Sequence, residues 1–195
     1  MVRLFVSIEL PAVVKQRLEL LCCDVPGARW VDPEQIHLTL RFIGEVDELV
    51  FRDVEAALDE VRAPSFEMAL KGVGHFPPRG EPRVLWVGVE KSAALVQLHD
   101  RVERALVRAG VEPERRRFSP HVTLARLNHT PARVVGSYLA MNGLLRCEPF
   151  AVREFHLYSS ALSAKRAVHC CEASYALREG DVPLAGRDLA ASEKR

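Results

Sequence analysis

The spacing of hydrophobic residues divides the chain into short strands and helices. Leu4–Leu10 is a run of β-branched and aromatic residues that Pro11 closes, which is typical of a strand. Hydrophobic residues recur at helical spacing from 12 to about 23 and, most clearly, from 47 to 62. The same criteria predict strands at 36–43, 66–73, 84–89, 121–127 and about 150–159, and helices at 93–109 and about 131–141.

Proline and glycine separate neighbouring elements and indicate the fold class. Residues 31–33 form a predicted turn, Gly44 is expected to end the strand at 36–43, and the Pro/Gly-rich segment 75–82 is too stiff for regular structure. The order of strands and helices in the first half is roughly repeated in the second half. Such a mixture favours an α+β fold with antiparallel sheets over a doubly wound parallel sheet.

Length and charge bound the class of protein. The 195 residues include 27 basic and 26 acidic side chains, a formal net charge of +1, and 48% hydrophobic residues. This is the composition of a globular chain, and it excludes a polybasic protein that coats nucleic acid. We predict one domain over residues 1–180 and a loosely docked tail at 181–195, where proline, glycine and charge predominate.

The cysteines and the lack of long apolar runs indicate a location. Four of the five cysteines form the adjacent pairs Cys22-Cys23 and Cys170-Cys171, and neighbours in sequence rarely satisfy disulfide geometry with each other. We therefore expect reduced thiols and a cytoplasmic protein. The sequence shows neither a signal peptide nor a membrane-spanning run, so no membrane partner is expected. We predict a monomer.

One short motif occurs twice. His37-Leu38-Thr39-Leu40 lies in the first half of the chain and His121-Val122-Thr123-Leu124 in the second. Side chains on a strand alternate between faces, so each motif places its histidine and threonine on one face and its apolar residues on the other. Arg41 is expected to share the face of His37. A single His-x-Thr is most often a surface pair, but two copies in the same apolar frame indicate a functional site.

Two histidines in one cleft suit acid–base chemistry. Imidazole has an ordinary pKa near neutrality, so one ring can remove a proton while the other supplies one. Threonine hydroxyls can hold phosphoryl oxygens. The sequence has no Walker loop, no Gly-x-Gly-x-x-Gly, no zinc-like spacing of histidine and cysteine and no carboxylate cluster. We therefore predict neither a metal nor another cofactor.

The chain resembles the 2H phosphoesterase superfamily and, within it, the RNA 2′,3′-cyclic phosphodiesterases long called 2′-5′ RNA ligases. The resemblance covers roughly residues 2–178. It rests on both His-x-Thr motifs and on the segments Arg3–Pro11, His37–Val46, Phe118–Arg126 and Phe155–Ser160. It implies a bilobal, pseudo-twofold α+β fold, with two antiparallel sheets flanking a central cleft and helices outside.

The resemblance also implies roles for individual residues. His37 and His121 correspond to the catalytic pair, and Thr39 and Thr123 correspond to phosphate-binding hydroxyls. The remaining histidines lack motif partners and are expected to be structural or to lie on the surface: His75, His99, His129, His156 and His169.

The fifth residue after each histidine is Phe42 in the first motif and Arg126 in the second, and in similar proteins these positions suit base stacking and phosphate contact. Strict alternation places both on the face opposite the histidines. They reach the cleft only if each strand ends, twists or bulges after its motif. The simpler alternatives are that Phe42 is a core residue and Arg126 a solvated charge.

Two further features near the motifs are open to interpretation. The run Arg115–Arg117 precedes the second motif and either steers RNA phosphates toward the cleft or forms a solvated loop. Tyr158 is a candidate for the lining of the cleft.

The activity that the resemblance implies is metal-independent hydrolysis of RNA 2′,3′-cyclic phosphate ends to 2′-phosphomonoesters. The implied partners are RNA ends, tRNA fragments or small nucleotides. We assign His37 as the acid and His121 as the base, although a near-symmetric pair does not reveal these roles. Three alternatives stay open: 2′-5′ ligation of tRNA halves, opening of ADP-ribose cyclic phosphate, and a non-catalytic module that binds RNA or nucleotides.

Overall fold

The computed structural model describes residues 1–23, 25–162 and 167–178, so the tail predicted at 181–195 lies outside the described residues. In this part of the chain the helices are α1 (Ala12–Glu19), α2 (Glu48–Asp59), α3 (Ala93–Arg108), α4 (Ala132–Asn142) and the 3-10 helix η1 (Pro33–Gln35). The strands are β1 (Val2–Glu9), β2 (Ala28–Trp30), β3 (His37–Val46), β4 (Phe66–Met68), β5 (Leu70–Phe76), β6 (Val84–Val89), β7 (His121–Leu127), β8 (Phe150–Val152), β9 (Glu154–Leu162) and β10 (Ala167–Ala176).

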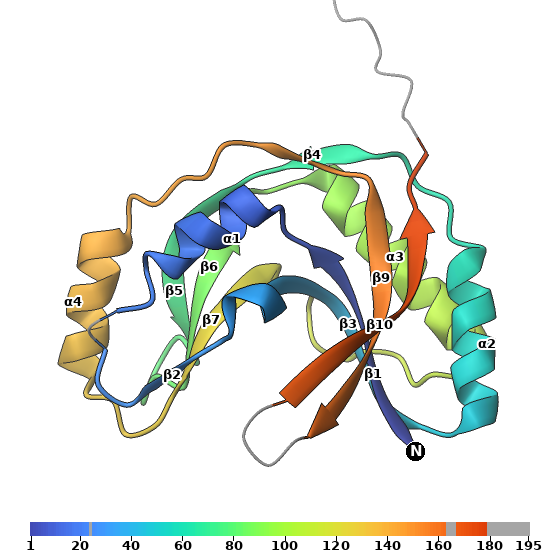
Figure 1. The fold of residues 1–195 in the computed structure, drawn as a ribbon, viewed down its shortest axis with the longest axis horizontal. Coiled ribbons are helices and arrows are strands. Elements are labelled where there is room, and N and C mark those ends of the chain that lie inside the picture. Colours follow the sequence, from blue (N-terminus) through green and yellow to red (C-terminus); the bar gives the residue numbers. More distant parts are fainter. Residues whose placement is uncertain (24, 163–166, 179–195) are drawn as a thin grey trace, which may run out of the picture.

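An arched antiparallel sheet organises the molecule (Figure 1). Its strands follow the order β10-β9-β1-β3-β7-β6-β5, β2 pairs with β7 on the edge away from β6, and β4 and β8 form a separate two-stranded sheet. Helices α1 and α4 lie beside one half of the arch and α2 and α3 beside the other (Figure 1). The expected α+β class is confirmed. The sheets of the two halves are joined between β3 and β7 into one sheet of eight strands.

Helices α2 and α3 begin where the sequence provides a side-chain cap, whereas α1 and α4 each follow a proline. Asp47 accepts hydrogen bonds from the backbone N–H groups of Leu49 (3.0 Å) and Val50 (2.9 Å), so α2 starts after it. Ser92 caps α3 in the same way, through Leu95. Helix α1 ends at Glu19, earlier than predicted, and the next residue, Leu20, is 80% exposed.

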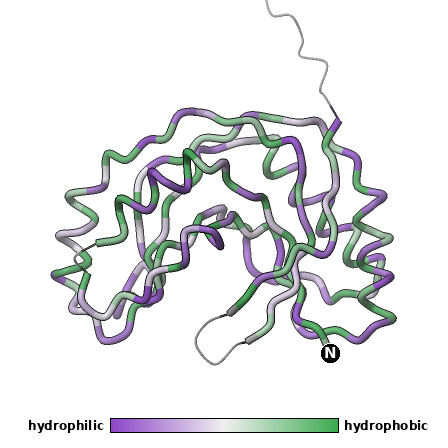
Figure 2. Tube along the Cα trace, viewed as in Figure 1, coloured by the Kyte–Doolittle hydropathy of each residue, from purple (hydrophilic) through white to green (hydrophobic). Residues whose placement is uncertain are grey.

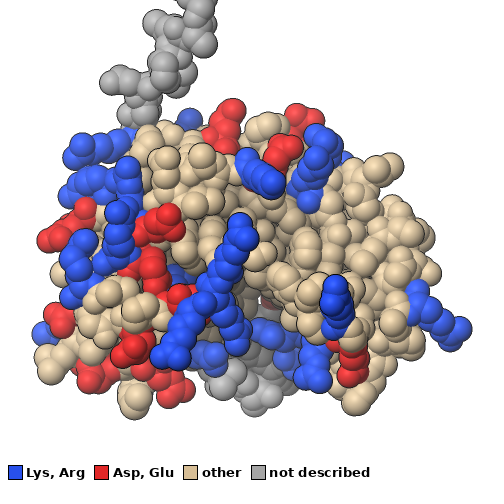
Figure 3. Space-filling view, turned by 180° about the vertical axis from the view of Figure 1, so that it is seen from behind, with Lys and Arg blue, Asp and Glu red and all other residues tan. Residues whose placement is uncertain are grey.

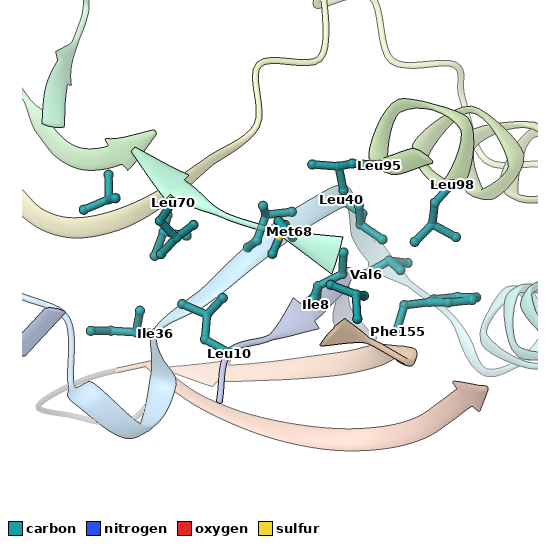
Figure 4. Packing of buried hydrophobic residues seen from close by; sticks show 14 of the residues in the cluster. Val6, Ile8, Leu10, Ile36, Leu40, Met68, Leu70, Leu95, Leu98 and Phe155 are labelled. Carbon is teal, nitrogen blue, oxygen red and sulfur yellow. The ribbon is translucent and has the colours of Figure 1, made fainter. Parts of the chain in front are cut away.

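The core lies between the sheet and the helices. Figure 4 shows Val6 and Ile8 of β1 and Leu40 of β3 facing Leu95 and Leu98 of α3, and all five side chains are buried. Hydrophobic and hydrophilic residues alternate along the trace in Figure 2, as the pleat of a strand with one buried face requires.

The ends of two predicted strands are wrong, and two strands were not predicted. Strand β3 continues past Gly44 to Val46, because Ile43 bulges out of the pairing with β1 and the glycine takes a φ of +97°. His75 and Phe76 belong to β5 instead of a loop. Strands β2 and β10 were not predicted, since one has three residues and the other shows little hydrophobic alternation.

Both motif strands carry a β-bulge at the same place. In β3, Thr39 and Arg41 pair with successive residues of β1, which leaves Leu40 as the extra residue. In β7, Thr123 and Ala125 pair with successive residues of β6, which leaves Leu124 as the extra residue. Each bulge reverses the alternation that follows it, so the fifth residue after each histidine turns to the histidine's own side.

The predicted position of Arg41 is wrong because of the bulge in β3. This side chain does not share the face of His37 but is buried on the opposite side, where its Nε donates to Oε2 of Glu103 at 2.6 Å. Its other nitrogens donate to the carbonyl oxygens of Glu112 (2.5 Å) and Phe42. The guanidinium therefore ties the bulge to α3 and to the segment that leads to the second motif.

We expect Arg41→Ala to lower the free energy of unfolding by about 3–5 kcal/mol, because Arg41 is buried and its removal leaves the partly buried Glu103 carboxylate without its cation. Arg52→Ala is the matched control, since Arg52 forms an exposed ion pair with Glu48 and its loss should cost about 0.5 kcal/mol or less. Urea unfolding followed by circular dichroism measures both. Equal losses in the two variants would contradict an anchoring role for Arg41.

Candidate active site

The two motif strands pair near their first residues. Leu38 of β3 pairs antiparallel with Val122 of β7, and both side chains are fully buried. Continuing this register by one residue on each side sets His37 across from Thr123 and Thr39 across from His121, on the face opposite the buried pair. We call this sheet surface, defined by His37, Thr39, His121 and Thr123, the motif face.

The backbone fixes both imidazole rings in the same way. Nδ1 of His37 donates to the carbonyl oxygen of Gln35, and Nδ1 of His121 donates to that of Ser119, each at 2.7 Å. A carbonyl oxygen only accepts, so each neutral ring carries its proton on Nδ1 and has a lone pair on Nε2. Nε2 of His37 lies 3.1 Å from the Thr39 hydroxyl. Nε2 is thus, in each ring, the nitrogen that the backbone does not bind.

Aromatic side chains surround His37. The Phe5 ring stacks on His37 with centroids 5.0 Å apart and on Tyr158 at 5.4 Å, and it lies 6.0 Å from the Phe42 ring. Phe42 is 57% exposed, so it is not the core residue of the simpler alternative. The bulge in β3 thus brings Phe42 to the motif face, where an exposed ring can stack on a base.

A second aromatic group lies beside His121. Phe76 meets this ring edge-on at 4.9 Å between centroids, and Trp86 lies 6.4 Å away. The indole covers Gly74 so closely that a Cβ there would be 2.3 Å from it. Gly74 is therefore needed for Trp86 to lie flat on the sheet. Each motif histidine accordingly has its own aromatic wall.

His169 of β10 is a residue of the site that the sequence did not indicate. It was expected to be structural or to lie on the surface, but its ring meets His37 edge-on at 5.4 Å and Phe5 at 4.9 Å. It also lines a pocket of about 60 Å³ beside His37, together with Glu9, Lys15 and Tyr158, among others. Its strand was not predicted, and this is why its position could not be foreseen.

Burial beneath these rings shifts the titration of His37. Its pKa is lowered to about 4, mainly by desolvation and to a smaller extent by the positive charges of His169 and Lys15, while the Gln35 carbonyl opposes the shift. His37 is therefore neutral at pH 7. Desolvation also lowers the pKa of His169.

The other histidines and the arginine run lie apart from this constellation. His156 is buried and bonds the Ser174 hydroxyl at 2.9 Å, and His99 stacks on Phe118 at 4.0 Å. Arg115–Arg117 are exposed. On the side drawn in Figure 3, lysine and arginine side chains gather beside a hollow between the two halves of the molecule.

Arg126 is exposed on the motif face, because the bulge at Leu124 turns it to the side of His121. In the described part of the chain, no cluster of three or more histidine, cysteine or acidic residues could hold a metal ion. Within the same residues, no helix has the length and apolar character needed to cross a membrane.

We expect His169→Ala to raise the pKa of His37 from about 4 toward its ordinary value near 6.5, because the substitution exposes the ring and removes a nearby positive charge. The imidazole Cε1–H signals in an NMR pH titration measure this directly. His129→Asn is the control, since His129 is exposed and lies outside the site. A His37 pKa that stays near 4 in His169→Ala would refute this role.

Comparisons with known proteins agree with this geometry. The family model of the 2′-5′ RNA ligase superfamily matches residues 9–163. An RNA 2′,3′-cyclic phosphodiesterase of Archaeoglobus fulgidus is 32% identical over 176 residues, which cover 86% of this chain and 96% of the relative. Another, from Aeropyrum pernix, is 47% identical over 98 residues, which cover 50% of this chain and 56% of the relative.

A solved structure with a similar fold is that of E. coli LigT complexed with 3′-AMP. It aligns with a TM-score of 0.74 and 25% identity, over 90% of this chain and 98% of that one. The match to the family model spans most of the sequence and includes both His-x-Thr motifs, and therefore this chain belongs to the 2′-5′ RNA ligase superfamily.

Proposed function

We propose that this protein hydrolyses 2′,3′-cyclic phosphate ends of RNA to 2′-phosphomonoesters, with His37 and His121 as acid and base. The observation that carries the proposal is the antiparallel pairing of β3 with β7 at Leu38 and Val122, since this pairing puts both histidines and both threonines on one face. The relatives named RNA 2′,3′-cyclic phosphodiesterase support the choice of substrate.

The reaction needs two proton transfers and stabilisation of phosphoryl charge. A water molecule attacks phosphorus in line and gives its proton to Nε2 of His121, while the P–O3′ bond breaks and O3′ takes a proton from Nε2 of His37. Thr39 and Thr123 donate hydroxyl hydrogen bonds to the nonbridging oxygens. The product keeps phosphate on O2′, and the two histidines exchange protons with solvent before the next cycle. No step requires a metal.

The low pKa of His37 makes its role as acid depend on the substrate. In the free protein the ring is neutral at pH 7 and cannot donate a proton from Nε2. Burial removes the water that would stabilise a positive charge on His37. A phosphate anion placed against Nε2 stabilises this charge instead, so it favours the imidazolium. Substrate binding then loads the acid, and the aromatic wall keeps the ring neutral until that moment.

We expect His37→Ala and His121→Ala each to lower kcat by about 10²–10⁴-fold, because each variant lacks one proton-transfer group. The double variant should be only slightly slower than either single one, since the two rings act as a unit. The assay follows an oligoribonucleotide with a 2′,3′-cyclic end, in the presence of EDTA, and identifies the product isomer.

His129→Asn should retain full activity in the same assay, because this side chain is exposed and asparagine tolerates the positive φ of 52° at that position. Most activity retained in either single histidine variant would exclude the two-imidazole mechanism. Loss of wild-type activity in EDTA would indicate a metal. A 3′-phosphate product would show that the other ester bond breaks.

We also expect anion binding to be coupled to proton uptake. Sulfate keeps its charge near pH 6, so any proton taken up on binding goes to the protein. Calorimetric titration with sulfate at pH 6, in two buffers of different ionisation enthalpy, should show up to about one more proton taken up by the wild type than by His37→Gln, because the anion raises the pKa of His37. Equal uptake by the two proteins would contradict loading of His37.

A further inference from the structure

A second arginine stands beside Arg126. Arg29 of β2 and Arg126 of β7 are directly opposite partners. On β7, Arg126 lies between Ala125 and Leu127, which also pair with β2. Those two side chains are buried, so the arginine between them points to the motif face, and Arg29 points the same way because opposite residues share a face. Both arginines are exposed.

This pair is unfavourable for the folded protein on its own. Like charges directly opposite on neighbouring strands repel each other. Among the residues that the structure describes, neither guanidinium forms an ion pair or hydrogen bond that would offset the repulsion. The pair therefore presents uncompensated positive charge to any ligand on this face.

The backbone holds the two arginines in register. The N–H of Val31 donates to the carbonyl of Leu124 at 2.8 Å, and that of Asn128 donates to Gly27 at 3.0 Å. Gly27 has a φ of +80°, and a Cβ there would lie 2.4 Å from the Asn128 oxygen. Only glycine fits this turn, so the close placement of two cations is built into the strands and not left to a flexible loop.

The pair makes the two ends of the motif face chemically different. The fifth residue after His37 is Phe42, which has the Phe5 ring beside it, whereas the fifth residue after His121 is Arg126, which has Arg29 beside it. One end thus offers rings to a base and the other offers two guanidinium groups to a phosphate. Single-stranded RNA carries both groups in each nucleotide.

We propose that Arg29 and Arg126 together bind a backbone phosphate that precedes the reacting end, so that the substrate class is an oligoribonucleotide and not a free cyclic mononucleotide. This proposal rests on the proposed function, because the reacting phosphate between the motif histidines sets the register of the RNA. The terminal base then stacks at the Phe42 end, and the strand leaves the site past the arginine pair.

The test compares Arg29→Gln with Arg133→Gln, which removes the same charge from an exposed position on α4. Fluorescence anisotropy measures the binding of a labelled tetraribonucleotide that ends in a 2′-phosphate, and competition measures the binding of 2′-AMP. We expect Arg29→Gln to weaken oligonucleotide binding about tenfold more than mononucleotide binding. The slope of log K against log salt for the oligonucleotide should fall by about 0.7, the value for one phosphate contact on a single strand. Arg133→Gln should change neither quantity.

Thermal unfolding separates this role from a structural one, because Arg29→Gln relieves the like-charge repulsion and should not lower Tm. The proposal fails if Arg29→Gln binds the oligonucleotide as the wild type does, or if it loses affinity for both ligands equally. Turnover of an oligoribonucleotide with a 2′,3′-cyclic end by the wild type is measured separately. Its absence would refute the proposed hydrolysis, while the oligonucleotide binding would still decide the role of the arginine pair.

Discussion

The antiparallel pairing of Leu38 with Val122 is the contact on which the rest of the site depends. It joins β10-β9-β1-β3 on one side to β7-β6-β5 on the other, and it is fully buried. Because residues next to a buried pair point to the opposite face, this one contact turns both histidines and both threonines toward the same side. A slip of one residue would send one motif into the core, so the hydrophobic frame of the motif specifies the register.

The repeated bulge adds a second constraint to this pairing. Without it, His-x-Thr would be followed on the same face by Arg41, and Phe42 and Arg126 would lie in the core. With it, a core position is filled by Arg41, whose guanidinium is satisfied by Glu103 and two carbonyl groups. The motif face gains a ring at one end and a cation at the other. The same backbone irregularity in both halves thus produces different chemistry, because the two halves carry different residues at one position.

Much of the fold and of the site could be predicted from the sequence, and the rest depends on how the strands pair. The strand His121–Leu127 has the predicted bounds, since its alternation is strong and a single face is buried. The side to which Arg41 points could not be predicted, because a bulge is a property of two strands. β10 was missed because His169-Cys170-Cys171-Glu172 shows no hydrophobic period. Gly74 and Gly88 inside strands were the available signal that a ring, here Trp86, lies close to the backbone.

The residues that we assign to function also lower the stability of the folded protein. His37 packs against the rings of Phe5 and His169, where its charged form is disfavoured, and Arg29 and Arg126 repel each other with no described partner. A sequence selected for stability alone would avoid both features, since each is relieved by a conservative substitution. A bound phosphodiester chain relieves both at once, because its anions favour the imidazolium at one point and neutralise the guanidinium groups at another. The two unfavourable features therefore both support the polyanionic ligand that we propose for the motif face.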